Sequence, residues 1–394
     1  MSVIDKCTSY NRPNELKSAG LYPYFLNFDG RDAGTARMAD GREVVMCGSN
    51  DYLGLSTDPR VIQAAARAAE RYGAGCTGSR FLNGNLELHD QLERELAQFF
   101  GKPAALVLAT GYQANLGAIA GLCGPGDIVF LDKEAHASLI DATRLSRAKI
   151  QWFAHNDTAE LADKLARVAE SNNCMVVVDG VYSMEGDLCP LPELVDVCGR
   201  FGATLLVDDA HGGGVLDKGR GTGSHFGLTA DVPLITLTFS KAFGSIGGAI
   251  LGDETVIDYL RHNARSLMFS ASASPSNTAA ALESLRILQA EPWRCSTVAG
   301  NADFMRRELT TLGYEVGASE TPIVPVETGD DISTLLAWNL LIEQGVYVNA
   351  VLPPAASPRL RTSYTAVQTE DQLQRAVDGF RAVRDQVLRA PARV

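Results

Sequence analysis

The sequence lacks several features that mark whole classes of protein. It has no excess of basic residues, because the formal net charge is −12 at pH 7. Nucleic-acid and anionic-membrane surfaces need clustered Lys and Arg, so neither is expected here, although local basic sites for small anions are not excluded. The first twenty residues have no signal-peptide apolar segment and no arginine-rich transit character, and no stretch reaches the length of a membrane span. We therefore expect a cytoplasmic protein with no membrane span and no nucleic-acid partner.

Paired cysteines are also missing. No C-x-x-C pattern occurs, and the cysteines lie in apolar or mixed surroundings at Cys7, Cys47, Cys76, Cys123, Cys174, Cys189, Cys198 and Cys295. A disulfide framework is not expected in a chain of this size, and scattered thiols of this kind are typical of reduced, buried cysteines in a cytoplasmic protein. No metal site is expected.

Internal repeats, low-complexity tracts and charged tails are absent as well. The chain has 394 residues, of which 46% are hydrophobic and 21% charged. This composition is ordinary for a globular protein, and the length exceeds what a single core usually reaches. The sequence predicts an N-terminal segment (1–58), a large domain (59–285) and a smaller C-terminal domain (286–394).

Apolar runs alternate with helix signals in the first three quarters of the chain. Asp58 and Pro59 precede an amphipathic run that stops at Gly73, which is the expected order at the two ends of a helix. Short apolar runs predict strands at 104–108, 128–131, 175–178, 204–207, 234–238 and 248–251. The run 104–122 is interpreted as a buried strand followed by a helix. Such alternation predicts an α/β fold with a mainly parallel sheet covered by helices on both faces.

The pattern changes after a predicted helix over 275–289. Helices are expected at 298–312, 332–344 and 371–388, with strands near 323–326, 346–351 and 360–364. This arrangement predicts the smaller α+β domain.

Lys241 lies directly after the predicted strand 234–238. A lysine amine at a strand tip forms an imine with a carbonyl cofactor if burial or neighbours lower its pKa. A single lysine is more often a solvated surface residue. Here, however, two hydroxyls suited to a phosphate, Thr238 and Ser240, precede it, and a glycine-rich stretch follows.

Asp208 ends another apolar strand. A carboxylate there can pair with the pyridinium nitrogen of pyridoxal 5'-phosphate (PLP), so that the ring acts as an electron sink. His211 is placed to hydrogen-bond the phenolic oxygen of the same cofactor. The structural alternatives are a helix-capping aspartate and an ordinary loop histidine.

Two further strand tips carry candidate residues. Thr110 and Gly111 stand between a strand and a helix, where the first helical amides form an anion site. His136 follows the strand 128–131 and could stack on a cofactor ring. Each of these features has a structural alternative, but their agreement at successive strand tips favours one ligand site, because ligands of open α/β sheets bind beyond the carboxyl ends of the strands.

The ordered motifs resemble those of the α-oxoamine synthases, a family of PLP-dependent acyltransferases. The motifs are SNDYLGL (49–55), GSRFLNG (78–84), TGYQAN (110–115), HASLIDA (136–142), DGVYSMEGD (179–187), VDDAHGGG (207–214), TFSKAFG (238–244) and RLRTSYTA (359–366). The resemblance covers nearly the whole chain. It implies the PLP-dependent transferase fold type I and a homodimer whose active sites are shared between subunits.

The resemblance also implies roles for individual residues. Lys241 matches the lysine that binds PLP as an imine, Asp208 the partner of the pyridinium, His211 the donor to the phenolic oxygen and His136 the histidine stacked on the ring; these four are the expected catalytic residues. Further expected cofactor contacts are Gly111, Tyr112, Ser183, Thr238, Ser240, Ser270 and Ser272, the last two reaching the phosphate of the neighbouring subunit. Asn50 and Arg361 match the positions that hold the amino-acid carboxylate.

The implied reaction is a decarboxylative Claisen condensation of an amino acid with an acyl thioester, giving an α-amino ketone, CO2 and a free thiol. Motifs such as GSRFLNG and TFSK look closest to serine palmitoyltransferase-like members, which makes serine the leading substrate. Alanine or glycine, and acyl carrier protein in place of CoA, stay open. An aminotransferase or C–S lyase of the same fold is an alternative, and a non-catalytic partner subunit is a weaker one because Lys241 is present.

Overall fold

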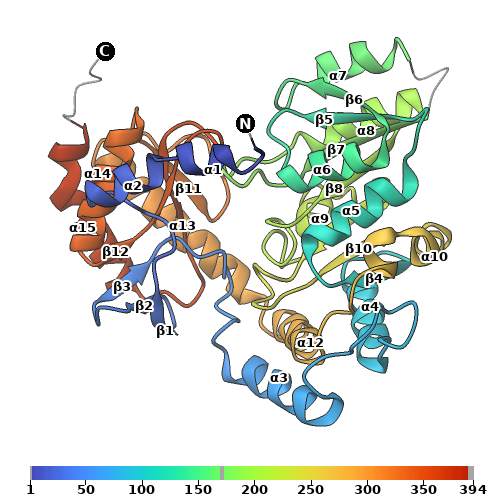
Figure 1. Ribbon diagram of the computed structural model, residues 1–394, viewed down its shortest axis with the longest axis horizontal. Coiled ribbons are helices and arrows are strands. Elements are labelled where there is room, and N and C mark those ends of the chain that lie inside the picture. The colour runs from blue at the N-terminus through green and yellow to red at the C-terminus, as the bar shows by residue number, and fades with distance from the viewer. Residues whose placement is uncertain (1, 169–172, 389–394) are drawn as a thin grey trace. The chain divides into compact units, whose positions relative to one another are not determined.

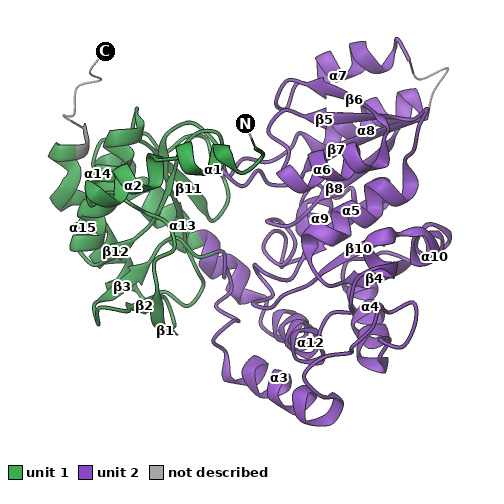
Figure 2. Cartoon of the chain, viewed as in Figure 1, with its two compact units in different colours: residues 1–49, 300–394 green, residues 50–299 purple. Residues whose placement is uncertain are grey.

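A computed structural model describes residues 2–168 and 173–388. The chain divides into two compact units, one made of residues 50–299 (unit 2) and one made of residues 1–49 and 300–394 (unit 1), as Figure 2 shows. This division differs from the boundaries expected at residues 58 and 285. The first 49 residues belong to the smaller unit because their strands pair there, and the second division falls inside helix α13 (Trp293–Thr311).

Unit 2 is built on a seven-stranded sheet (Figure 1). The strand order is β4-β10-β9-β8-β7-β5-β6, and β10 runs antiparallel to both of its neighbours while the other pairs are parallel. Their bounds are Ala104–Leu108 (β4), Ile128–Asp132 (β5), Lys149–Phe153 (β6), Cys174–Asp179 (β7), Thr204–Asp208 (β8), Leu234–Thr238 (β9) and Gly248–Gly252 (β10). The predicted α/β fold with a mainly parallel sheet is confirmed.

Helices connect these strands and cover the sheet (Figure 1). The chain moves along the sheet in one direction through α5 and α6, and in the opposite direction through α7 and α8. Because crossovers between parallel strands are right-handed, the two pairs of helices lie on opposite faces. The helices of unit 2 before α13 are α3 (Pro59–Tyr72), α4 (Glu87–Phe99), α5 (Gly111–Leu122), α6 (Ala137–Ser146), α7 (Thr158–Leu165), α8 (Leu191–Phe201), α9 (Gly221–His225), α10 (Glu254–Asn263), α11 (Arg265–Met268) and α12 (Pro275–Ala290), with a short 3₁₀ turn at Thr229–Asp231.

Local chemistry sets the ends of these elements. The Asp58 side chain accepts a hydrogen bond from the Arg60 amide, which begins α3, and Gly73 ends the helix with a positive φ. Every residue of β5, β7 and β10 is buried. Strands buried on both faces need continuous apolar runs, which is why the sequence pattern located them.

Unit 1 contains two smaller sheets. One has the order β1-β2-β3-β12, in which Val346 pairs with Val45 in parallel, and the other has the order β11-β14-β13. The run 346–351, predicted as one strand, therefore supplies two strands to different sheets. The strands are β1 (Phe28–Asp32), β2 (Thr35–Met38), β3 (Glu43–Met46), β11 (Ile323–Glu327), β12 (Val346–Tyr347), β13 (Asn349–Val351) and β14 (Arg359–Ser363), and the helices are α1 (Asp5–Ser9), α2 (Arg12–Ser18), α14 (Asp331–Glu343) and α15 (Glu370–Leu388).

Two expectations about the chain as a whole can be compared with the structure. All eight cysteines are free thiols. Among the helices in residues 2–168 and 173–388, none combines the length and apolar character that a membrane crossing requires.

Candidate active site

A pocket of about 260 Å³ opens in unit 2 where β4, β5, β7, β8 and β9 end. This is the edge of a parallel sheet at which ligands bind in open α/β folds. Nine of the residues expected at the site line the pocket: Gly111, Tyr112, His136, Ser183, Asp208, His211, Thr238, Ser240 and Lys241. The strand tips predicted from the sequence therefore meet at one place.

Lys241 is held in this pocket by His211. The Lys241 Nζ lies 2.8 Å from the His211 Nε2, and the other ring nitrogen of His211 lies 2.6 Å from the Tyr52 hydroxyl. Tyr52 in turn donates to Asn50 Oδ1 over 3.3 Å. Asn50 does not line the pocket, but this chain of hydrogen bonds joins it to the lysine. Tyr52 had no expected role, although it belongs to the SNDYLGL motif.

Asp208 is buried at the tip of β8 with its carboxylate fixed on both oxygens. The backbone amide of Ala210 donates to Oδ1 over 3.1 Å, and Asn115 Nδ2 donates to Oδ2 over 2.7 Å. Removing a carboxylate from water is costly unless donors compensate it. Asp208 is therefore a fixed acceptor at the pocket wall.

The N-terminus of α5 forms the polar end of the pocket. Thr110 caps this helix by accepting from the Gln113 amide, so the first amides of the helix remain available to a ligand. A Cβ at Gly111 would lie 2.7 Å from both Cβ and Oγ1 of Thr238, so only glycine permits this approach. The Thr238 and Ser240 hydroxyls lie 2.9 Å apart beside it. Amides, hydroxyls and a helix N-terminus together suit an anion such as a phosphate.

His136 begins α6 on the opposite side of the pocket. Its backbone amide donates to Asp179 Oδ2 over 2.8 Å, and its Nδ1 lies 2.7 Å from the Ser138 hydroxyl. Burial lowers the pKa of His136. The negative charge of Asp208 acts against this shift, and the positive charge of Lys241 adds to it. Burial and the neighbouring Asp208 raise the pKa of Asp179 well above its ordinary value.

Ser183 lies in the loop between β7 and α8, and a buried ion cluster holds this loop. His155 places Nδ1 3.0 Å from Asp132 and Nε2 2.9 Å from Asp187, four residues after Ser183. Burial alone would lower the pKa of His155, but the hydrogen bonds that the ring donates to the two carboxylates outweigh this effect and raise the pKa to about 10. The protonated ring therefore ties the end of β5 to the loop that carries Ser183.

The remaining expected residues lie elsewhere. Ser270 accepts from Gln113 Nε2 over 2.9 Å, and Ser272 donates to the Gly78 carbonyl over 3.0 Å; neither lines the pocket. Arg361 is buried on β14 of unit 1, where Nη1 donates to Ser363 Oγ over 3.3 Å. Asn115, Ser138 and Asp179 line the pocket without having been predicted as site residues. Asn115 and Ser138 lie within the quoted motifs TGYQAN and HASLIDA, and Asp179 opens DGVYSMEGD.

The sequence matches the family model described as aminotransferase class I and II over residues 42–380. The chain belongs to this family. A serine palmitoyltransferase of Sphingobacterium spiritivorum is 44% identical over 380 residues, which cover 95% of each chain. A putative 8-amino-7-oxononanoate synthase 2 of Mycobacterium tuberculosis is 42% identical over 382 residues, covering 96% of this chain and 49% of that protein.

A solved structure of a serine palmitoyltransferase variant from S. paucimobilis, with a bound PLP–myriocin aldimine, has a TM-score of 0.95 at 33% identity and covers 98% of this chain and 99% of that one. The aminotransferase class I and II fold is therefore fold type I, as the sequence predicted. Within the family, the chain groups with the α-oxoamine synthases, which confirms the resemblance drawn from the motifs.

The groups that line the pocket can be compared with the groups that PLP presents. PLP presents an aldehyde, a pyridine nitrogen, a phenolic oxygen and a phosphate. The pocket presents an amine at Lys241, a fixed carboxylate at Asp208, an imidazole at His211 and the anion site at Gly111. Each group of the cofactor has a counterpart of matching charge or hydrogen-bonding type, so the residues fit.

Proposed function

We propose that this protein is a PLP-dependent acyltransferase that condenses an amino acid with an acyl thioester and releases CO2 and a free thiol. The single observation that carries the proposal is the meeting of Lys241, Asp208 and the Gly111 anion site in one pocket. The relatives named serine palmitoyltransferase and 8-amino-7-oxononanoate synthase support the acyl-transfer chemistry.

Different residues of the pocket would hold different groups of the cofactor. Lys241 would hold its aldehyde carbon, Asp208 its ring nitrogen and His211 its phenolic oxygen, while Gly111, Tyr112, Thr238 and Ser240 would hold its phosphate. His136 would lie against the ring, and Ser183 near the phenolic oxygen. Bound PLP supplies an electron sink for the electron pair left when the substrate Cα loses a proton.

Lys241 is the residue placed to move that proton. As a free amine beside the substrate Cα, Nζ would act as the general base that takes this proton. The Cα electron pair then forms a bond to the thioester carbonyl carbon, and the thiolate leaves. The amino-acid carboxylate leaves as CO2, and Cα regains a proton. Asp208 would favour this course, because a carboxylate beside the ring nitrogen stabilises the protonated form of that nitrogen.

Arg361 and Asn50 are assigned to the amino-acid carboxylate. A guanidinium matches a carboxylate with two parallel hydrogen bonds, which orients the bond that must break when CO2 leaves. Serine is the proposed amino acid, and a long-chain acyl thioester the proposed partner, because the relative at 44% identity is named serine palmitoyltransferase. Alanine or glycine, and acyl carrier protein instead of CoA, are the alternatives.

We also propose that the enzyme is a homodimer with shared active sites. The side chains of Leu82 and Phe269 are exposed by 78% and 72%, next to the loop of Ser270 and Ser272. Large exposed apolar side chains near a functional loop favour a protein partner. Sedimentation analysis should give a dimer, and a Ser272→Ala variant should bind PLP less tightly; a monomer with full activity would remove the shared site.

The test of the reaction measures CO2 and free thiol with purified protein and PLP. Both products should appear only when an amino acid and an acyl thioester are present together. Amino acids are compared by the spectral change on binding, and acyl thioesters then by thiol release with the best amino acid. Amino transfer to a 2-oxo acid without thioester would replace the proposal with an aminotransferase. A protein that stays colourless with added PLP would indicate a non-catalytic subunit.

A further inference from the structure

Asn115 is a buried amide on the inner side of α5, and the proposed reaction gives it no role. Its side chain contacts three other polar groups on three other elements. Nδ2 donates to Asp208 Oδ2 over 2.7 Å and to Ser138 Oγ over 2.8 Å, and Oδ1 accepts from Thr236 Oγ1 over 2.6 Å. Asn115 is 3% exposed, Ser138 1% and Thr236 1%, so water competes little for these bonds.

The charge on Asp208 fixes the orientation of the Asn115 amide. A carboxylate can only accept, so the amide nitrogen must face it and the amide oxygen must face Thr236. Both hydrogens of Nδ2 are then used, one by Asp208 and one by Ser138.

The Ser138 hydroxyl connects the oriented Asn115 amide to the ring of His136. Because the hydroxyl oxygen accepts from Asn115, its single hydrogen is left for His136 Nδ1, which lies 2.7 Å away. The backbone amide of Ser138 also donates to Nδ1 over 3.3 Å, as the cap of α6. Both bonds require a lone pair on Nδ1. A neutral imidazole carries one N–H, so the proton must be on Nε2.

We propose that Asn115 is a positioning residue for the proposed reaction: it fixes the carboxylate of Asp208 and, through Ser138, holds His136 neutral with its proton on Nε2. The inference rests on the proposed function in one respect, that Asp208 and His136 are the groups that meet the cofactor ring. A single buried amide would thus orient the carboxylate that meets the ring nitrogen and determine the tautomer of the histidine that stacks on the ring. Thr236 supports it by holding the amide oxygen.

The first experiment determines the tautomer of His136 directly. The full-length protein is labelled with ¹⁵N-histidine, and the ring nitrogens are correlated with the carbon-bound ring protons by NMR, without amino acid or thioester; a His136→Gln variant identifies the signals. We expect an unprotonated Nδ1 and a protonated Nε2. A proton on Nδ1 of the wild-type protein would overturn the inference. The only variant that this measurement uses is His136→Gln, which identifies the signals.

Variants of the network test whether Asn115 acts through its hydrogen bonds or only by filling space in the core. Asn115→Leu keeps much of the volume but removes both donors, so the His136 signals should move to a mixture of tautomers. Thr236→Val should shift them in the same direction, while Thr236→Ser, which keeps the hydroxyl, should restore the wild-type spectrum. Thr143→Val is the matched control, because Thr143 is a buried threonine of α6 whose hydroxyl donates to the Leu139 carbonyl and not to the network. A wild-type tautomer in both Asn115→Leu and Thr236→Val would contradict the proposal.

The two proposals can fail separately. If condensation occurs but wild-type Nδ1 is protonated, the positioning role fails and the function stands. If the tautomers behave as expected but no CO2 or thiol is released, the network is real and the proposed function fails.

Discussion

Lys241 and Asp208, a basic and an acidic residue, line the same pocket, and different neighbours hold each side chain. His211 lies 2.8 Å from the lysine amine, while Asn115 and the Ala210 amide hold the carboxylate. Each group is therefore positioned by its own neighbours at the wall of the pocket.

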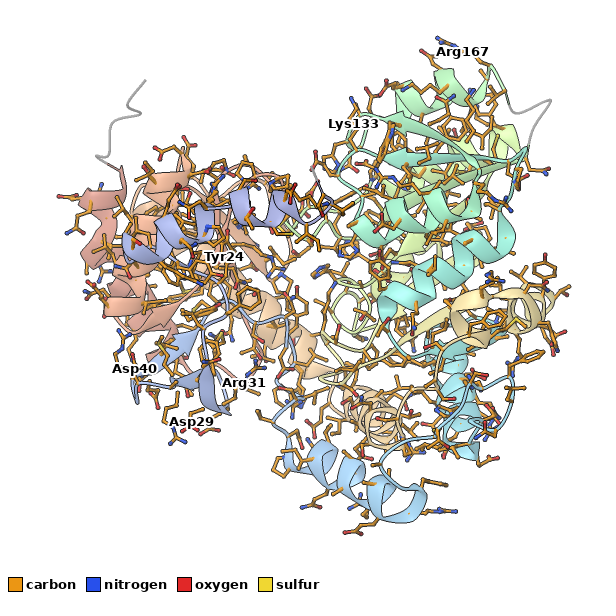
Figure 3. All side chains as sticks on the ribbon, in the orientation of Figure 1. Tyr24, Asp29, Arg31, Asp40, Lys133 and Arg167 are labelled. Atoms are coloured by element: carbon orange, nitrogen blue, oxygen red, sulfur yellow. The ribbon has the colours of Figure 1, made fainter. Side chains whose placement is uncertain are left out.

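Replacing Lys241 with Ala should abolish turnover. General-base catalysis by a positioned side chain is worth about 10²- to 10⁴-fold, so kcat should fall at least that far, as measured by thiol release. The protein should remain folded and bind PLP without a covalent bond. Lys133→Ala is the control, since Lys133 follows β5 and is exposed (Figure 3). Full activity in Lys241→Ala would remove the lysine from the mechanism.

Substituting Arg361 should chiefly weaken amino-acid binding. Arg361→Lys keeps the charge but loses the planar fork, so KM for the amino acid should rise by about tenfold, or about 1.4 kcal/mol, while PLP binding is unchanged. Arg375→Lys on α15 is the control because its side chain is exposed. An unchanged KM in Arg361→Lys would assign the carboxylate to another residue.

At the scale of the secondary structure elements, the N-terminus of α5 packs closely against the end of β9. Gly111→Ala places a Cβ 2.7 Å from Thr238, so the helix start must move away from β9. Such overpacking costs about 1–3 kcal/mol and should weaken PLP binding, because the amides shift with the helix. PLP titration and urea unfolding measure the two effects. Gly124→Ala, just beyond the other end of α5, has no atom within 4 Å of its added Cβ and should leave both unchanged.

The link between β5 and the Ser183 loop should depend on pH. The pKa of His155 is about 10 in the folded protein and about 6.5 in an unfolded chain, so it is raised on folding. Its contribution to stability is complete below pH 6.5 and is lost as the pH rises through 10. At about 1.4 kcal/mol per pKa unit this amounts to a few kcal/mol, reduced because the ring is 28% exposed.

Urea unfolding of wild type and His155→Gln at pH 6 to 10 checks this link. The difference in unfolding free energy between the two proteins should shrink as the pH rises. His262→Gln, at an exposed histidine of α10, is the control. A difference that stays constant across this range would show that the charge of His155 does not hold the loop.

The sequence predicted the bounds of a strand well where the strand is a continuous apolar run. β4 and β9 match their predicted bounds, because each is a continuous apolar run that is almost completely buried, even though β4 lies at one edge of the sheet. β6, with the sequence KIQWF, was not predicted because it is a half-buried edge strand that lacks such a run. Asn115 and Ser138 were not predicted because their contacts join residues from different elements, which spacing along one helix does not reveal.

At the scale of the whole molecule, the smaller unit depends on both ends of the chain. β1, β2 and β3 form one sheet with β12, and Val44, Val45 and Cys47 are fully buried in its core. By contrast, α1 and α2 contribute no buried residue. The first 49 residues are thus divided into a dispensable part and an essential part.

Deleting residues 2–49 should unfold unit 1. The lost strands and core residues represent much of the 5–15 kcal/mol that stabilises a typical domain, so circular dichroism and solubility should both fall. Deleting residues 2–19 should change the free energy of unfolding by less than about 0.5 kcal/mol, because it removes exposed side chains and one exposed ion pair, Arg12 with Asp331. Equal stability of the two truncated proteins would contradict the role of β1–β3.

The pairing of β3 with β12 also sets the order in which the protein can fold on the ribosome. Unit 2 is an uninterrupted stretch that ends at residue 299, so its sheet can form while the C-terminal part is still being translated. Strand β3 has to wait until Val346, the partner of Val45, has been made. During that interval the edge of β3 that faces β12, with its apolar residues Val44 and Val45, is uncovered, so this edge is where a nascent chain would need a chaperone.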